Sequence, residues 1–318
     1  MILITGGAGF IGLHTARELV EKGQEVLLVD RHTFQAPDYL TPHMDKRVKA
    51  VQGDILNPSF LHQLIREYHV SSIIHAAVLL GAGGDFYKAM KINLQGTVEI
   101  LEAARISGLR RVTFLSSIAV YLPFKKGNSL HEEMDLPAIS TDYISMTKKA
   151  GEQIFLLYSN EFGLSAPILR MPLVWGPGYR GELNPLKIMI KNTLAGKPAI
   201  LPHIYGKGNS VYLYVRDCAK SIGLVHLAPS LDYPIYNVSD GLTHNLMDFA
   251  GVIKEIIPEA SIELGEREPE EDQKSIVEKE LPPMDIERIE GDLGFKPDYD
   301  LNEGIKAYID WFRAGNDD

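Results

Sequence analysis

The sequence has very little cysteine, no excess of positive charge and no long hydrophobic run. Cys218 is the only cysteine in 318 residues, which excludes an internal disulfide and a thiolate metal cluster. The formal net charge of -10 argues against a nucleic-acid partner, because such proteins carry a basic face. No window approaches the roughly 18 apolar residues that a membrane-spanning helix needs. We therefore expect neither a nucleic-acid nor a membrane partner.

The histidines also lack the spacing of a metal site. Ten of them are scattered along the chain without an HxxH or HExxH pattern, so we expect no metal. The first residues, Met1-Ile2-Leu3-Ile4, run straight into glycines without a basic segment, which argues against a signal peptide. These features predict a cytoplasmic protein in which Cys218 is a buried structural thiol.

Short β-branched runs alternate with helical patterns through the first half of the chain. The helical patterns cover Ile11–Lys22, Pro58–Tyr68, Phe86–Ser107 and Tyr143–Phe162. Strands separated by helices predict an α/β fold with a doubly wound parallel sheet and right-handed crossovers. The runs typical of its buried strands are Met1–Thr5, Glu25–Asp30, Val48–Gln52, Ser72–His75, Val112–Ser116 and Ser165–Arg170.

The pattern changes after Arg170. A turn cluster at Trp175–Gly178 is followed by a helix at Pro185–Ala195, a strand at Val211–Val215, a helix at Arg216–Leu227 and a strand at Pro234–Val238. This order predicts that the second half interleaves with the first. Residues 1–174 with about 211–240 would form the larger domain, and about 175–210 with 241–318 a smaller substrate-binding domain.

A glycine-rich turn joins the first strand to the first helix. Gly6 suits a tight turn, Gly9 lets the backbone approach a pyrophosphate, and Gly12 allows close helix–strand packing. The helix N-terminus, beginning with Phe10 and Ile11, would offer N–H groups and a partial positive charge to the phosphates. The turn therefore predicts dinucleotide binding.

An acidic residue ends the second strand. Asp30 stands 24 residues after Gly6, where a carboxylate can accept hydrogen bonds from an adenosine ribose. Because that carboxylate would repel a 2′-phosphate, NAD is favoured over NADP. Arg31 follows directly and could soften this preference, so NADP stays open.

The three-residue spacing of these glycines resembles the extended short-chain dehydrogenase/reductase family, the NAD-dependent sugar epimerases and dehydratases. Further segments resemble this family in the same order along nearly the whole chain. These are Gly53-Asp54-Ile55, His75-Ala76-Ala77-Val78, Asn93-Leu94-Gln95-Gly96-Thr97, Leu115–Tyr121, Arg170–Gly178, Tyr236-Asn237-Val238 and Leu293–Pro297. The resemblance implies a Rossmann-type fold and an NAD-dependent enzyme.

The resemblance also implies site residues. Asp54 and Ile55 would hold the adenine, Ala76, Ala77 and Val78 would lie under the cofactor, and Pro172 would lie near the nicotinamide. Asn93, Ser116, Tyr143 and Lys148 would complete the cofactor site, and the catalytic group would consist of Ser117, Tyr143 and Lys148.

The catalytic tyrosine is out of register. The family places tyrosine and lysine four residues apart on a helix, about 40° apart around its axis. Here Ile144 takes the tyrosine position, and Tyr143 lies five residues before Lys148, about 140° away on an unbroken helix. Either an extra residue or bulge still delivers Tyr143 to the site, or Ser117, Lys148 or another residue does its work.

The substrate side also departs from the family pattern. The arginine that clamps the diphosphate of a nucleotide sugar corresponds to Ser210 here. A second clamp could only be Arg267, which three nearby carboxylates surround in what we interpret as a solvated acidic loop. A glycine-rich loop at Leu79–Asp85 would line the substrate pocket. These departures favour a smaller or neutral carbohydrate-like substrate.

The sequence thus predicts hydride transfer at a hydroxyl or keto carbon of a sugar or sugar-like substrate. Two alternatives stay open: an NAD-dependent dehydrogenase of a non-nucleotide hydroxy compound, and a non-catalytic NAD-binding sensor. The resemblance also implies a homodimer, in which the helices at Phe86–Ser107 and Tyr143–Phe162 of two copies form a four-helix bundle.

Overall fold

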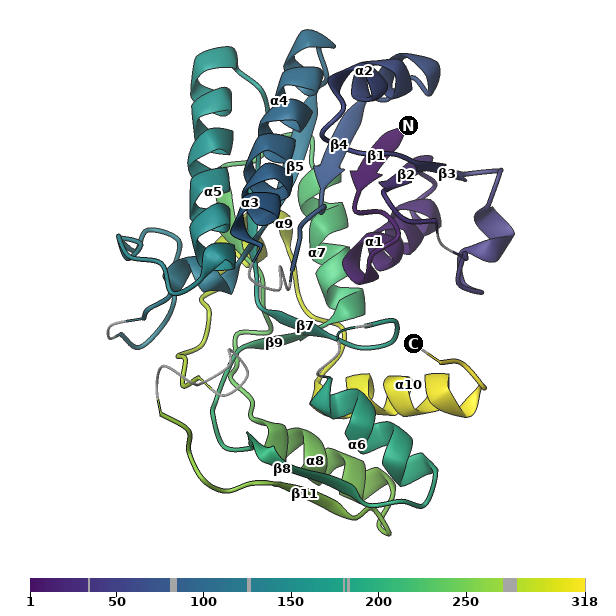
Figure 1. The fold of residues 1–318 in the computed structure, drawn as a ribbon, viewed down its shortest axis with the longest axis vertical. Helices are drawn as coiled ribbons and strands as arrows, with labels where there is room; N and C mark the ends of the chain where they lie inside the picture. Colours follow the sequence, from purple (N-terminus) through teal and green to yellow (C-terminus); the bar gives the residue numbers. More distant parts are fainter. Residues whose placement is uncertain are drawn as a thin grey trace.

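A seven-stranded parallel sheet forms the centre of the molecule (Figure 1). The computed structural model describes residues 1–33, 35–80, 85–124, 127–179, 181, 184–270 and 279–317. The strand order is β10-β6-β5-β4-β1-β2-β3, and every neighbouring pair is parallel. The strands are β1 (Ile2–Thr5), β2 (Val26–Asp30), β3 (Val48–Gln52), β4 (Ser72–His75), β5 (Arg111–Ser117), β6 (Ile168–Met171) and β10 (Ile235–Asn237).

Helices cover both faces of this sheet, as the doubly wound prediction requires (Figure 1). The side chains of β1 alternate between two cores. Ile2 and Ile4 pack under α1 (Phe10–Glu21) and α7 (Val215–Leu227), with α9 (Glu287–Leu293) nearby. Leu3 faces the other core, beneath α2 (Pro58–Glu67), α4 (Gly96–Ile106) and α5 (Tyr143–Phe162). The predicted Rossmann-type fold is confirmed.

A smaller lobe lies beyond the carboxyl ends of the strands, at the bottom of Figure 1. Its core joins residues from before and after the strand β10, which is why the lobe interleaves with the sheet. The predicted domain boundaries stay a proposal, and the cores depart from them at two places: Tyr212 and Tyr214 belong to the core of the lobe, and Ile289 and Phe295 to a core of the sheet. The lobe contains α6 (Pro185–Leu194), α8 (Leu246–Ile256), α10 (Leu301–Arg313), the parallel pair β8 (Ala199–Tyr205) and β11 (Ile262–Gly265), and beside them the pair β7 (Leu173–Trp175) and β9 (Tyr212–Tyr214).

Several elements differ from the prediction. The strands β7, β8 and β11 were not predicted, and Val215 begins α7 instead of ending a strand. The run at Ser165–Arg170 starts as a strand only at Ile168, because Ser165 makes just an isolated bridge to Arg111. The strand β3 lies at the sheet edge, where Lys49, Ala50 and Gln52 are exposed, so it is not buried.

The predicted helix at Phe86–Ser107 is interrupted. It consists of α3 (Phe86–Met90), a π-helical turn η2 (Lys91–Gln95) and α4. Two 3₁₀ turns also occur, η1 (Thr41–His43) and η3 (Ile118–Tyr121). The Cys218 thiol is fully buried, as predicted. Over the ranges that the structure describes, every helix is too short or too polar to cross a membrane.

Candidate active site

The glycine-rich turn brings backbone very close to backbone. Gly6 has a φ of 67°, and a Cβ atom there would lie 2.9 Å from the Ala77 Cα. A Cβ at Gly12 would lie 2.5 Å from the Gly6 carbonyl oxygen. Gly9 is the N-cap of α1 and supplies no side-chain cap, so the first-turn N–H groups face outward without one. This arrangement suits an anionic phosphate at the helix N-terminus.

A cavity of about 130 Å³ opens beside this turn, at the carboxyl ends of β4, β1 and β2. The strand order reverses at this point, and such a switch point is where doubly wound sheets bind their ligands. Six predicted cofactor residues line the cavity: Gly6, Asp30, Arg31, Ile55, Ala77 and Val78. The lining residues Val29, His32 and Ile92 were not predicted, although His32 follows a strand end and could have been found. Leu79 was predicted to line the substrate pocket, and it lines this cavity.

At the end of β2, this cavity is lined by a carboxylate that already accepts hydrogen bonds from the protein. The Asp30 carboxylate accepts hydrogen bonds from the N–H groups of Ala8 at 3.2 Å and His32 at 3.1 Å. The Arg31 Nε lies 3.5 Å from the Asp54 carboxylate, so its charge is paired. Both side chains are exposed, so this pair is weak.

Buried hydroxyls fix the segment after β4. Thr5 Oγ1 bonds His75 Nδ1 at 2.8 Å and accepts from the Ala77 N–H at 3.2 Å. Burial lowers the pKa of His75 to about 3, so the ring is neutral. Asn93 lies in the π-helical turn, where its amide accepts from the Leu79 N–H at 2.7 Å. The turn therefore aims Asn93 at the cofactor edge of β4.

Lys148 is buried at the carboxyl end of β5. Its ammonium donates to the Leu115 carbonyl oxygen at 2.5 Å and lies 4.7 Å from the centre of the Phe114 ring. Burial lowers the pKa of Lys148 to about 8, although the Glu152 carboxylate acts in the opposite direction. Ser117 ends the same strand two residues later and is half-buried. An amine with a lowered pKa and a serine hydroxyl therefore both lie at the carboxyl end of β5.

The register of α5 is regular around Tyr143. The helix begins at Tyr143, capped by the Asp142 carboxylate, and continues as α-helix through Lys148. The Tyr143 ring is half-buried and makes an edge contact with Phe86 of α3, with ring centres 6.0 Å apart. The five-residue separation from Lys148 is therefore not shortened by a bulge. The catalytic role of Tyr143 stays a prediction.

An ion pair anchors α5 to the sheet beneath the site. Arg170 of β6 donates to both Glu152 carboxylate oxygens, at 3.0 and 2.8 Å, and both side chains are at most 3% exposed. The Ser116 hydroxyl donates to the same carboxylate at 2.6 Å. The Ser116 hydroxyl hydrogen is thus committed to this pair, so its oxygen can only accept further hydrogen bonds.

Removing one partner should show how much this anchor contributes. We expect Glu152→Ala to lower the free energy of unfolding by about 3–5 kcal/mol, because it leaves the Arg170 guanidinium buried without its counter-charge. Denaturant titration measures the change. Glu102→Ala, which removes an exposed ion pair with Arg105, should leave the midpoint almost unchanged. Equal effects of the two variants would contradict the structural role of the pair.

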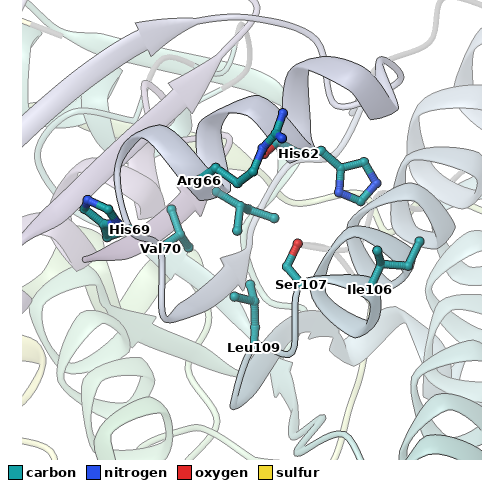
Figure 2. A pocket seen from close by; sticks show the side chains of 8 residues that line it. His62, Arg66, His69, Val70, Ile106, Ser107 and Leu109 are labelled. Carbon is teal, nitrogen blue, oxygen red and sulfur yellow. The ribbon is translucent and has the colours of Figure 1, made fainter.

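A larger hollow of about 780 Å³ lies away from these residues (Figure 2). It is formed where α2 and α4 end, just before β4 and β5 begin, so it lies at the amino edge of the sheet. Doubly wound sheets bind ligands at the opposite edge, and we do not assign the active site here. Its lining is His62, Ile65, Arg66, His69, Val70, Ile106, Ser107 and Leu109.

The two predicted clamp positions are both weak candidates. Ser210 is fully buried and pairs through its backbone with His244, with both N–H···O distances at 2.9 Å. Arg267 is exposed after β11. The acidic loop extends into Glu271 and Asp272, which lie outside the described residues. So do residues 81–84 of the predicted substrate loop.

The fold and the switch-point cavity define a Rossmann-type dinucleotide-binding protein. The NAD dependent epimerase/dehydratase family matches residues 2–239, and the chain belongs to that family. It is similar to UDP-glucuronate 4-epimerase of Thermodesulfobacterium geofontis, at 26% identity over 97% of this chain and 95% of that protein. It is also similar to mouse dTDP-D-glucose 4,6-dehydratase, at 27% identity over 98% of this chain and 88% of that one.

Solved structures agree with the family. UDP-glucose 4-epimerase of Thermus thermophilus, in complex with NAD, superposes with a TM-score of 0.82 at 25% identity, covering 99% of both chains. MoeE5 in complex with UDP-glucuronic acid and NAD gives 0.81 at 26% identity, again over 99% of both. The predictions of family, enzymatic nature and NAD as cofactor are confirmed.

Proposed function

We propose that the protein catalyses reversible hydride transfer at a hydroxyl- or keto-bearing carbon of a sugar or nucleotide sugar. One observation supports this proposal: the glycine turn, the switch-point cavity and the buried Lys148 all lie at the ends of neighbouring strands. A Cβ atom would fill the turn at Gly6 and Gly12, so the cradle fits a closely approaching pyrophosphate. NAD, when bound, supplies the hydride acceptor and donor.

We assign the remaining cofactor contacts by position. Gly9, Phe10, Ile11 and Gly12 would hold the phosphates, and Asp30, Asp54 and Ile55 the adenosine. Toward the nicotinamide, the residues would be Ala76, Ala77, Val78, Asn93, Ser116, Lys148 and Pro172.

The proton that accompanies hydride transfer needs an acceptor near the substrate oxygen. We assign this role to Lys148, whose pKa of about 8 leaves part of the amine neutral at pH 7. Ser117 would polarise the same oxygen with its hydroxyl. During oxidation the substrate O–H gives its proton to the Lys148 amine, and during reduction the ammonium returns it.

Tyr143 is the competing proton acceptor, and two variants separate the candidates. If Lys148 acts without a tyrosine partner, Tyr143→Phe should keep turnover within about tenfold of wild type, because the phenol takes no part in proton transfer. Ile144→Tyr restores the four-residue spacing and should move the pH profile. A loss of about 10³-fold in Tyr143→Phe, with NAD affinity unchanged, would assign the proton transfer to Tyr143 instead.

The experiment that tests the function is a substrate panel at saturating NAD. UDP-glucose, UDP-glucuronic acid and dTDP-glucose represent the compounds named for the similar proteins. The corresponding free sugars and sugar acids represent the non-nucleotide alternative, which the serine at position 210 favours. Turnover of at least one compound, followed by chromatography, is expected. A panel without turnover, despite NAD binding, would contradict the proposed function.

The same panel separates an epimerase or dehydratase from a dehydrogenase. An epimerase or dehydratase regenerates its cofactor, so product forms without accumulation of reduced nicotinamide. A dehydrogenase of a hydroxy compound releases reduced nicotinamide in step with product. Absorbance of reduced nicotinamide, recorded together with product, decides between them.

We also propose a homodimer through α4 and α5, and a cytoplasmic location. Both helices expose large apolar side chains, with Ile106, Leu157 and Phe162 each more than half exposed. Leu157→Glu should therefore convert a dimer into a monomer, which sedimentation velocity measures. Leu242→Glu, at an equally exposed leucine outside these helices, is the matched control. A wild-type protein that sediments as a monomer would contradict the proposal.

A further inference from the structure

A buried histidine joins the phosphate-binding helix to the start of the smaller lobe. His14 lies on α1, one turn after Phe10, and is 3% exposed. Its Nε2 lies 2.8 Å from the Pro177 carbonyl oxygen, 163 residues further along the chain. A carbonyl oxygen only accepts, so Nε2 carries the proton and donates. The ring is neutral, because burial lowers the pKa of His14 to about 4.

The contacts around this hydrogen bond form one compact group. The Phe10 ring packs edge-on against His14, with ring centres 5.6 Å apart, and also against Tyr179, at 5.3 Å. A Cβ atom at Gly178 would lie 3.7 Å from the Phe10 ring and 3.8 Å from His14 Nε2. Residues 176–179 therefore pack against the first residues of α1, whose N–H groups face the proposed phosphate position.

This turn is one of the covalent connections between the sheet and the smaller lobe. The chain leaves β7 at Trp175, passes through the glycine turn and enters the lobe at α6. Gly176 and Gly178 both have positive φ, at 134° and 90°, so the backbone here is bent into a shape that few side chains allow. The hydrogen bond from His14 thus ties α1 to the turn that precedes α6 along the chain.

We propose that His14 is a positioning residue that couples dinucleotide binding at α1 to the placement of the smaller lobe. A pyrophosphate at the N-terminus of α1 fixes that helix, and the hydrogen bond from His14 then fixes the turn at 176–179. The coupling needs the Nε2–H donor and not the ring alone. It rests on NAD binding at α1, and not on the identity of the substrate.

Hydrogen–deuterium exchange with ADP-ribose and with NAD tests this coupling. ADP-ribose carries the pyrophosphate without the nicotinamide, so direct nicotinamide contacts do not contribute. In wild type, both ligands should slow exchange in peptides covering residues 10–16 and also in those covering 174–194. In His14→Phe, the first group should stay protected and the second should lose most of its protection. In His14→Gln, whose amide can donate to Pro177, protection of the second group should return.

A second buried histidine provides the matched control. His226 bonds Ser72 and Thr113 at 2.8 Å each, at the amino edge of the sheet, which is the edge opposite the turn. His226→Phe should lower the thermal midpoint as His14→Phe does, yet keep the ligand-induced protection of 174–194. Equal protection in wild type and His14→Phe would overturn the proposal. So would an equal loss in the two phenylalanine variants, which would indicate general destabilisation. Neither outcome depends on turnover.

Discussion

Lys148→Met is expected to slow turnover by about 10³-fold while NAD still binds, because proton transfer in the active site contributes about that much. Methionine keeps most of the length of the side chain and loses only the titratable amine. Steady-state kinetics with a compound from the panel that the wild-type enzyme converts measures the loss of turnover. Calorimetric titration with NAD measures binding. Lys149→Met is the control on the neighbouring residue, whose ammonium instead donates to the carbonyl oxygens of Leu122, Pro137 and Ile139.

The fold should tolerate this change. The pKa of Lys148 is lowered from 10.5 to about 8 by burial, so its charged form is disfavoured in the folded state. Between these values the unfolded chain binds a proton that the folded chain does not, and stability rises with pH. Below pH 8 the folded protein carries the full cost of the buried charge. Lys148→Met removes that cost, so its thermal midpoint at pH 7 should not fall below that of wild type.

The pH dependence of kcat/KM independently tests the role of Lys148 as the proton acceptor. As the proton acceptor for oxidation, the amine must be neutral, and neutral amine increases as pH rises through about 8. We therefore expect kcat/KM for oxidation to rise from pH 6 to 9 and to level off above. In Lys148→Met this rise should disappear. A wild-type profile that falls over the same range would instead indicate that the charged ammonium is required.

Gly6→Ala is expected to weaken NAD binding by about 100-fold, which corresponds to about 2.7 kcal/mol. The added Cβ would lie 2.9 Å from the backbone of Ala77. Relief of this clash requires a shift of the glycine turn or of the segment after β4, and both segments line the cavity. Gly163→Ala is the matched control. Gly163 has nearly the same φ, 65° against 67°, but nothing lies within 4 Å of its Cβ position.

The two alanine variants thus share the backbone strain and differ in the close approach. Gly163→Ala should lose about 1–2 kcal/mol of stability, because alanine resists the left-handed region, and Gly6→Ala should lose more, because its Cβ also meets the Ala77 backbone. Only Gly6→Ala should lose NAD affinity. If both bind NAD as tightly as wild type, the turn is not the phosphate cradle.

The NAD half of the molecule could be predicted from the sequence because its signals are local. The strands β3 and β4 have the predicted bounds, and Gly6, Asp30 and Ala77 meet at one cavity, as parallel strand ends should. The strand β7 could not be predicted, because three residues between a proline and a glycine show no period. The strands β8 and β11 pair across about 60 residues, and their alternation is broken by Pro202.

The π-helical turn and His14 show a second limit. Around Ile92 and Asn93 the helix holds one extra residue per turn, yet the apolar spacing of Phe86–Ser107 looks continuous. His14 reads as a polar residue on an amphipathic helix, and its partner Pro177 lies in another part of the chain. A contact between distant segments decides the position of His14. For Tyr143, the sequence reveals the register but not the chemistry.

The most direct test of hydride transfer is a single turnover of the panel compound with the highest turnover, carrying deuterium on its reacting carbon. Absorbance of reduced nicotinamide should rise on mixing with the NAD-loaded enzyme, more slowly than with the protium compound, and this rise should vanish in Lys148→Met. Turnover with no reduced nicotinamide and no isotope effect would contradict hydride transfer at this site.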